Sequence, residues 1–286
     1  MRNETQPPTG LARRSHRLSK RETEQRMLRA ALTMVNRTGL TVSLEHLSFE
    51  DVIREAGVAR SAVYRHWPHK DLFLSDLVKE LAKAAIPDPT YDAAMIGLIK
   101  RVVAEREDWL ASTDRRHGLV IELFRQAALL DFQILYGSAQ WRTYLALHAT
   151  FLSLSEGELR DQIQQTLAES QQHSIRRVAA AWRQIAELFG YQLRPELGTT
   201  FETVATLASA SLRGLIIMAL SMPELATHRT KARPFGAART DEWSLAALAG
   251  GSIGTAFLEP DPTIAWDDQR LASVRDALNA LAIPDP

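Results

Sequence analysis

Apolar residues recur at helical spacing along most of this chain. Met27, Ala31 and Val35 share one face of a helix predicted over residues 20–37. Residues 19–22, Ser-Lys-Arg-Glu, match a capping box, in which the serine and glutamate side chains bond the first free amides of a helix. The pattern therefore predicts an amphipathic helix that begins close to residue 20.

Two short helices joined by a tight turn are predicted in residues 48–67, SFEDVIREAGVARSAVYRHW. Ser48 is placed to cap the first helix, and Gly57 follows it where a positive φ lets the chain turn sharply. Val63 is expected to anchor the second helix on the core. Pro68 ends this helix because the residue before a proline avoids the helical region. This arrangement is typical of a helix-turn-helix.

The rest of the pattern predicts helices rather than strands. A helix is expected from Asp71 to about Ala84, and Pro87 and Pro89 mark a domain boundary after it. No alternation of apolar and polar residues is long enough to seed a sheet, and residues 223–240 are expected to form a polar, basic loop. The other expected helices cover residues 91–111, 115–136, 139–153, 156–189, 196–221, 241–257 and 266–282.

The sequence thus predicts an all-α protein with three parts. Residues 1–18 hold few apolar positions and are expected to form a disordered basic tail. A helix-turn-helix domain is expected over residues 19–86, and a second helical domain over residues 87–286.

Composition narrows the class of protein. The chain has no cysteine, which excludes disulfides, thiol catalysis and thiolate metal sites and favours a reducing compartment. The N-terminus lacks the apolar core of a secretory signal. The most apolar long run, residues 203–220, is interrupted by Arg213 and rich in Ala and Ser, so we expect a buried helix there and not a membrane span. These features predict a cytoplasmic protein without a cofactor.

The net charge of zero hides an asymmetry. Residues 1–83 hold 15 Lys+Arg against 10 Asp+Glu, whereas the rest of the chain holds 19 against 24. A basic head on an acidic body fits an N-terminal contact with nucleic acid, although an offset of this size also arises by chance.

The second helix of the 48–67 segment concentrates side chains that recognise DNA. An arginine can pair bidentately with O6 and N7 of guanine. Tyrosine and lysine suit phosphate oxygens, which position a protein on DNA without reading its sequence. The polar residues on or near one face of this helix are Arg60, Ser61, Tyr64, Arg65 and His66.

Residues 20–83 resemble the DNA-binding domain of TetR-family transcriptional regulators. The resemblance rests on the spacing, the turn, the aromatic pair and the lysine taken together. The matching positions are Ala30-Ala31, Gly39, Ile53, Ala56-Gly57-Val58, Val63-Tyr64-Arg65-His66-Trp67, Lys70-Asp71 and Leu72.

This resemblance implies a DNA-binding regulator that is not an enzyme. Arg60 is then the expected base reader, Tyr64 and Lys70 are expected to hold phosphates, and Trp67 is expected to pack in the core. The implied DNA-binding residues are Ser48, Arg60, Ser61, Tyr64, Arg65, His66 and Lys70.

The resemblance implies that residues 19–86 form a DNA-binding domain and that residues 87–286 form a helical regulatory and dimerisation domain. It also implies a homodimer that binds a near-palindromic operator and is released from it by a small-molecule ligand. The helices near 203–220 and 241–257 are the expected interface, with candidates Leu207, Ser211, Leu212, Leu215 and Ile216. The ligand is expected in a cavity lined by Trp109, Phe124, Trp141, Phe151 and Trp182.

The chain departs from the family pattern in three respects. The link between Gly39 and Ser48 is a few residues longer than usual, and the C-terminal part is also long. Ala59 stands where Ser or Thr often caps the recognition helix, and the missing cap costs roughly 1 kcal/mol.

Two other classes of protein stay open. One is a hydrolase, because residues 250–254 fit G-x-S-x-G around Ser252; the surroundings, however, are helical and no histidine follows. Small residues there favour close helix packing instead. The other is a helical ligand-binding or scaffold protein with a degenerate DNA head. No metal site is expected, since His66 and His69 lack a third ligand.

Overall fold

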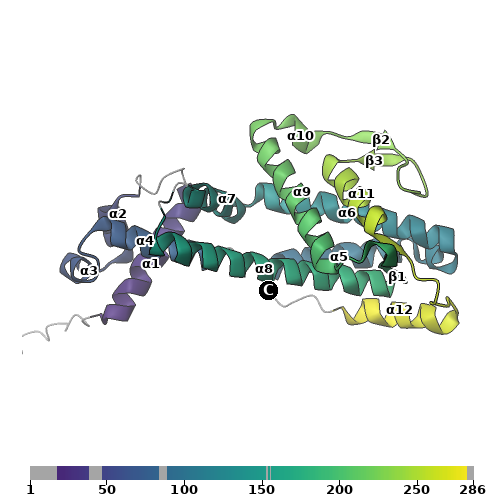
Figure 1. Cartoon of the computed structure of the whole chain (residues 1–286), viewed down its shortest axis with the longest axis horizontal. Helices are drawn as coiled ribbons and strands as arrows, with labels where there is room; N and C mark the ends of the chain where they lie inside the picture. Colours follow the sequence, from purple (N-terminus) through teal and green to yellow (C-terminus); the bar gives the residue numbers. More distant parts are fainter. Residues whose placement is uncertain (1–17, 39–46, 84–88, 153, 155, 282–286) are drawn as a thin grey trace, which may run out of the picture. The chain divides into compact units, whose positions relative to one another are not determined.

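The computed structural model of the chain describes residues 18–38, 47–83, 89–152, 154 and 156–281 (Figure 1). The predicted basic tail, the predicted helix stop at Gly39 and the predicted boundary at Pro87 lie outside the described residues. The chain forms two compact units, residues 1–80 and 81–286, so the division falls within a helix.

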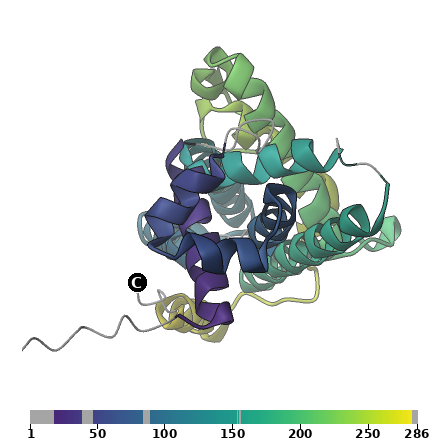
Figure 2. The same ribbon diagram turned by 90° about the vertical axis from the view of Figure 1, so that its left-hand side faces the viewer.

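The first unit contains the predicted helix-turn-helix (Figure 2). Helix α1 packs against α2 and α3, the two short helices on either side of the glycine turn. The helices of this unit are α1 (Lys20–Thr38), α2 (Phe49–Ala56), α3 (Arg60–His66) and α4 (Lys70–Lys83).

Local signals in the sequence account for these helix ends. The predicted capping box is present, since the Ser19 amide donates to Glu22 at 2.8 Å and the Glu22 amide donates to the Ser19 hydroxyl at 3.1 Å. Ser48 caps α2, and Gly57 adopts φ 60° and ψ 37° directly after it. Ala59 precedes α3 and offers no side-chain cap. These four predictions are confirmed.

Buried aromatic rings fix the angle between α2, α3 and α4. Trp67 is 1% exposed, as predicted for a core position, and its indole N–H donates to the Asp76 carboxylate at 2.9 Å. The Phe73 ring lies 5.1 Å from the rings of both Trp67 and Phe49. Val63, fully buried, turns the inner face of α3 towards this cluster. The outer face of α3 is consequently held in one orientation.

The second unit is a helical bundle in which α6 packs against α5 and α11, and α9 packs against α8 and α11 (Figure 1). The mainly helical prediction is confirmed. Its helices are α5 (Pro89–Ala104), the 3-10 turn η2 (Glu107–Ala111), α6 (Thr113–Gly137), α7 (Ala139–Leu152), α8 (Glu158–Leu188), the 3-10 turn η3 (Pro195–Leu197), α9 (Phe201–Ser221), α10 (Glu224–Thr227), α11 (Leu245–Phe257) and α12 (Asp268–Ala280).

Two small antiparallel sheets correct the prediction that the chain lacks strands. One pairs β1 (Tyr191–Leu193) with β4 (Leu258–Pro260), and the other pairs β2 (Thr230–Ala232) with β3 (Asp241–Trp243). Each strand has three residues, which is too short to show an alternating pattern. The predicted loop over residues 223–240 therefore contains α10 and β2.

Helix α9 is less buried than its composition suggests. The prediction of a buried helix at residues 203–220 is wrong for one face, because only 22% of its most apolar 18-residue window is buried. Within the described part of the chain, α9 alone is long and apolar enough to cross a membrane, a test that core helices of soluble proteins also pass. Ile216 turns into the bundle at 1% exposure, whereas Ile217 and Met218 are each 52% exposed.

The small residues of α11 allow close packing, as predicted. A Cβ atom at Gly254 would overlap the ring of Phe124 on α6, so only glycine admits that ring. Ser252 lies exposed within the same helix, and its hydroxyl donates to the Ala249 carbonyl at 2.8 Å. A nucleophile elbow needs a strand directly before the serine, but here a helix begins at Leu245 and continues past it.

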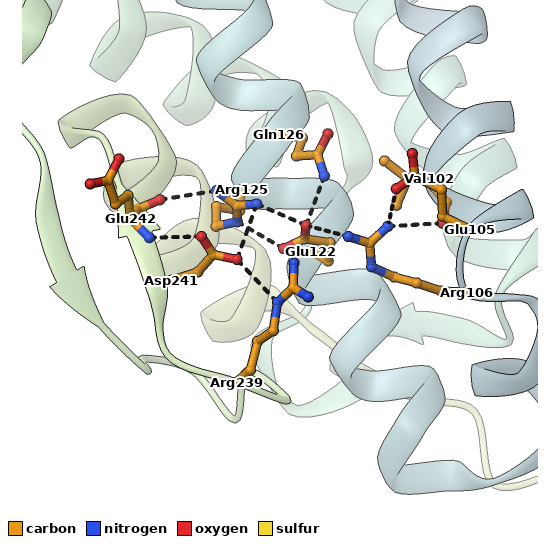
Figure 3. A network of polar contacts seen from close by, with 9 residues as sticks. All are labelled: Val102, Glu105, Arg106, Glu122, Arg125, Gln126, Arg239, Asp241 and Glu242. Atoms are coloured by element: carbon orange, nitrogen blue, oxygen red, sulfur yellow. Dashed lines mark hydrogen bonds and ion pairs between the residues drawn. The ribbon is translucent and has the colours of Figure 1, made fainter.

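A buried polar network joins α6 to its neighbours (Figure 3). The Glu122 carboxylate accepts from Arg106 at 3.1 Å, from two nitrogens of Arg125 at 2.8 Å each and from Gln126 at 2.7 Å. Arg125 also lies 3.5 Å from Asp241 on β3. The Glu122, Arg106 and Arg125 side chains are only 9, 10 and 14% exposed. The network thus connects the end of α5, the middle of α6 and the β2–β3 hairpin.

Candidate nucleic-acid interface

Helix α3 presents a polar outer face. Arg60, Ser61, Tyr64 and Arg65 are all exposed, while Val63 between them is fully buried. Arg60 and Tyr64 are four residues apart, as are Ser61 and Arg65, so these exposed residues lie on one side of the helix. Four side chains with N–H or O–H donors thus share the face opposite the core.

A carboxylate that sequence reasoning missed lies against this face. Glu50, on α2, accepts hydrogen bonds from the Arg60 Nε at 3.1 Å and from the Tyr64 hydroxyl at 2.9 Å. Arg60, and then Tyr64, hold the pKa of Glu50 below its ordinary value of 4.5 despite a small opposing effect of desolvation. The hydrogen bond to Glu50 also raises the pKa of Tyr64 above its ordinary value. No local sequence motif predicts this contact, because Glu50 and Arg60 are ten residues apart.

The other three predicted DNA-contacting residues lie at helix ends: Ser48 before α2, His66 at the end of α3 and Lys70 at the start of α4. The Ser48 hydroxyl accepts from the Asp51 amide at 3.3 Å, so it acts as a helix cap. His66 is half-buried, with its ring packed edge-on at 4.1 Å from the Trp67 ring. Lys70 begins α4 and is half-buried. The structure therefore brings Arg60, Ser61, Tyr64 and Arg65 onto one face of α3, and Ser48, His66 and Lys70 are not part of that face.

The second unit encloses a cavity of about 560 Å³. Its wall is formed by α5, α6, α8, α9 and α11, mostly through apolar side chains. Phe124 and Trp182, two of the predicted ligand-contacting residues, both line it, and their rings lie 5.4 Å apart. Asp131 and Arg177 are the charged residues among the described lining. A cavity of this size and polarity suits a drug-sized, largely apolar molecule.

Three of the predicted ligand-contacting residues do not line this cavity. Trp109 lies in η2, where the Arg106 guanidinium sits 5.6 Å from its ring. Trp141 packs beside Tyr144 within α7, and Phe151, near the end of the same helix, is covered by the Arg160 guanidinium at 4.9 Å. These rings fill contacts between helices, and composition alone did not distinguish them from cavity walls.

A polar pair supports one wall of the cavity and was also missed from the sequence. Tyr191 lines the cavity, and its hydroxyl lies 2.8 Å from Nδ1 of His117. Nε2 of His117 lies 2.8 Å from the Phe235 carbonyl, which can only accept, so Nε2 donates to it. Burial raises the pKa of Tyr191 to about 12, which keeps the phenol neutral. Local sequence spacing does not predict this contact, because 74 residues separate His117 from Tyr191.

Among the described residues, no group of three or more His, Asp or Glu side chains is placed to hold a metal ion. Neither His66 nor His69 belongs to such a group.

Comparison with known proteins identifies the first unit. Residues 28–77 match the family described as bacterial regulatory proteins, tetR family. No curated protein matches the chain. Among solved structures, full-length native TylP, a TetR regulator from Streptomyces fradiae, is similar with 14% identity and a TM-score of 0.37, covering 90% of this chain and 98% of that one.

The family match covers most of α1, all of α2 and α3, and the first part of α4. Those helices carry the glycine turn, the buried Trp67 and the exposed polar face of α3. Residues 28–77 therefore form a helix-turn-helix domain of the tetR family of bacterial regulatory proteins, which supports a role for the chain as a DNA-binding transcriptional regulator.

Proposed function

We propose that this regulator acts in the cytoplasm as a homodimeric repressor that binds a near-palindromic operator and leaves it when a small apolar ligand fills the cavity of the second unit. The observation that carries the DNA-binding role is the exposed face of α3, with Arg60, Ser61, Tyr64 and Arg65 held by a buried core. Two such helices in a dimer would enter successive major grooves roughly 34–36 Å apart.

Dimerisation through α9 is supported by an apolar stripe on its exposed side. The stripe is defined by Leu207, Ala210, Gly214, Ile217 and Met218, which are all exposed and recur at helical spacing. A Cβ atom at Gly214 would meet no other atom within 4 Å, so this part of the helix is open. A stripe with small residues at its centre lets a second helix approach closely.

The residues of the exposed stripe differ in part from the residues that were expected at the dimer interface. Ile216 packs inside the protomer with Phe132 and Ala246, and Leu212 and Leu215 line the cavity. Leu207 is the one expected large apolar residue that also lies on the stripe. We infer that the second copy of the chain covers the stripe itself.

Release by a ligand is supported by the place of the cavity, whose wall includes the same α9 and α11 that are expected to face the second protomer. A ligand there would act only if it binds the DNA-free state more tightly than the DNA-bound state. The apolar wall around Phe124 and Trp182 favours an uncharged or weakly charged molecule.

DNA recognition through α3 can be tested by alanine substitutions. Tyr64→Ala or Lys70→Ala is expected to weaken binding to DNA of any sequence, because each side chain is expected to hold a phosphate. For Lys70→Ala the slope of log K against log salt should also become shallower by about 0.9, since one phosphate is no longer neutralised. Arg60→Ala should instead abolish a preference of roughly 10- to 100-fold at one base pair. Fluorescence anisotropy with DNA that flanks the protein's own gene, and with random duplexes, measures affinity, salt slope and base preference.

The matched control is Arg275→Ala, which removes an exposed arginine of α12 in the second unit and should change none of these quantities. If Tyr64→Ala and Arg60→Ala both bind like the parent, the assigned roles are wrong. A parent protein whose DNA binding does not depend on salt would support the alternative of a ligand-binding or scaffold protein with a degenerate head.

A second prediction concerns the cavity. Ala127→Phe, a substitution on the part of α6 that lines it, is expected to weaken binding of the uncharged fluorescent probe N-phenyl-1-naphthylamine by roughly tenfold or more, because the larger side chain fills the space. The control Ala168→Phe adds the same ring at an exposed position of α8 outside the lining and should bind the probe like the parent. Equal probe affinity in all three proteins would mean that the cavity is not a binding site.

A further inference from the structure

Glu50 holds Arg60 by one edge of its guanidinium group. Nε and Nη2 of Arg60 both pair with Oε1 of Glu50, and the hydroxyl of Tyr64 donates to the same oxygen. The Arg60 and Glu50 side chains are 67 and 45% exposed, so this cluster lies on the surface and not in the core. The cluster joins α2 to the outer face of α3.

The remaining edge of the guanidinium group keeps its donors available. Within the described part of the chain, Glu50 engages Nε and Nη2 of Arg60 and not Nη1, although the Tyr64 hydroxyl also interacts with the guanidinium group. Nη1 and the second N–H of Nη2 form a fork whose geometry matches O6 and N7 of guanine. An arginine held through its Nε edge is thus preorganised for a bidentate base contact, and less of its side-chain freedom is lost on binding.

Glu50 is not needed to begin its own helix. The hydroxyl of Ser48 already caps α2, and Asp51 already places a negative charge in the first turn, where the helix dipole favours it. The Glu50 carboxylate also lies beside the proposed DNA-contacting face, where it would repel phosphates. Neither helix capping nor the helix dipole therefore accounts for the contact of Glu50 with Arg60 and Tyr64.

We propose that Glu50 is a positioning residue that determines specificity: it orients Arg60 towards a guanine and weakens complexes that rest on phosphate contacts alone. This inference depends on the proposed DNA-binding role of Arg60. In an operator complex the oriented fork gains two hydrogen bonds from the base, which offset the repulsion. On random DNA no such bonds form, so the negative charge only lowers the affinity.

The test compares the parent with Glu50→Gln, Arg60→Ala and the double variant. Each is titrated with a duplex that the parent selects from a random library, with all its single-base variants and with a random duplex. Glu50→Gln should bind the random duplex about two- to fivefold more tightly. Its preference at one G·C pair should fall from roughly 10- to 100-fold to about threefold or less. Arg60→Ala should lose its preference at that same pair, and the double variant should be no less discriminating than Arg60→Ala.

The matched control is Glu55→Gln, which removes the same charge from an exposed position of α2 outside the cluster and should leave every base preference intact. If Glu50→Gln retains all base preferences, the inference about Glu50 is wrong, but the proposed role of Arg60 is unaffected. If Arg60→Ala retains all base preferences, the proposed roles of Arg60 and Glu50 are both wrong. A merely structural role of Glu50 would lower affinity for every duplex by the same factor, which also contradicts the inference.

Discussion

Replacing Glu122 by alanine is expected to lower the free energy of unfolding of the second unit by about 3–5 kcal/mol. The substitution removes the buried carboxylate that Arg106 and Arg125 share, and both arginine side chains are at most 14% exposed. Arg106 then keeps the exposed Glu105 and Arg125 the more distant Asp241 as carboxylate partners. Removing one partner of a buried ion pair costs far more than the net gain from forming the pair. The loss of stability can be measured by denaturant unfolding at a fixed protomer concentration. Tryptophan fluorescence reports on the second unit, since five of the six tryptophans lie there.

The matched control is Glu105→Gln. Glu105 contacts the same Arg106 at 2.8 Å, but its side chain is 53% exposed, so its loss should cost under about 1 kcal/mol. Similar losses for Glu105→Gln and Glu122→Ala would show that burial does not determine the strength of this network.

The contribution of Glu122 should also depend on pH in a defined direction. Burial tends to raise its pKa, but hydrogen bonds from Arg125 and Gln126 and the charges of Arg125 and Arg106 together lower it below 4.5. A carboxyl group with a lowered pKa in the folded state stabilises the protein above its unfolded pKa, and this contribution disappears as the pH falls through the folded value. The stability difference between the parent and Glu122→Gln should therefore be full at pH 7 and should shrink below about pH 4.

The first unit was predictable from sequence because its signals are local. Ser48 and Gly57 act on the residues next to them, so the cap and the turn follow from the residue types alone. The core position of Trp67 followed from its place in the family pattern, and burial confirms it. The missing cap at Ala59 was likewise visible in the sequence.

The functional details depend on contacts between distant residues and were therefore missed. Glu50 meets Arg60 only because the turn folds α3 back beside α2, and Tyr191 meets His117 from 74 residues away in the sequence. Helical spacing predicts that a residue lies on a face but not which neighbour covers that face. This explains why Ile216, expected at the dimer interface, lies in the core, and why only two of five proposed aromatic residues line the cavity.

Ile217→Glu is expected to convert the dimer to monomers and to lower affinity for the operator by about 10²- to 10⁴-fold. Ile217 is 52% exposed in the protomer, so a glutamate there can remain hydrated while the protomer folds normally. In a dimer built on the α9 stripe, the same carboxylate would be buried against apolar side chains of the second copy, which is strongly unfavourable. A monomer holds one recognition helix and loses the gain from binding both half-sites at once.

Sedimentation velocity at micromolar concentration and anisotropy with the parent-selected duplex measure the two effects together. The control Ala272→Glu introduces the same charge at an exposed position of α12 outside the stripe and should stay dimeric with the affinity of the parent. If Ile217→Glu remains a dimer with full affinity, the two protomers meet elsewhere. If it is monomeric yet binds the operator as tightly as the parent, the two heads do not cooperate on DNA and the near-palindromic operator is contradicted. Only the joint loss of dimer and affinity supports α9 as the element that sets the spacing of the recognition helices.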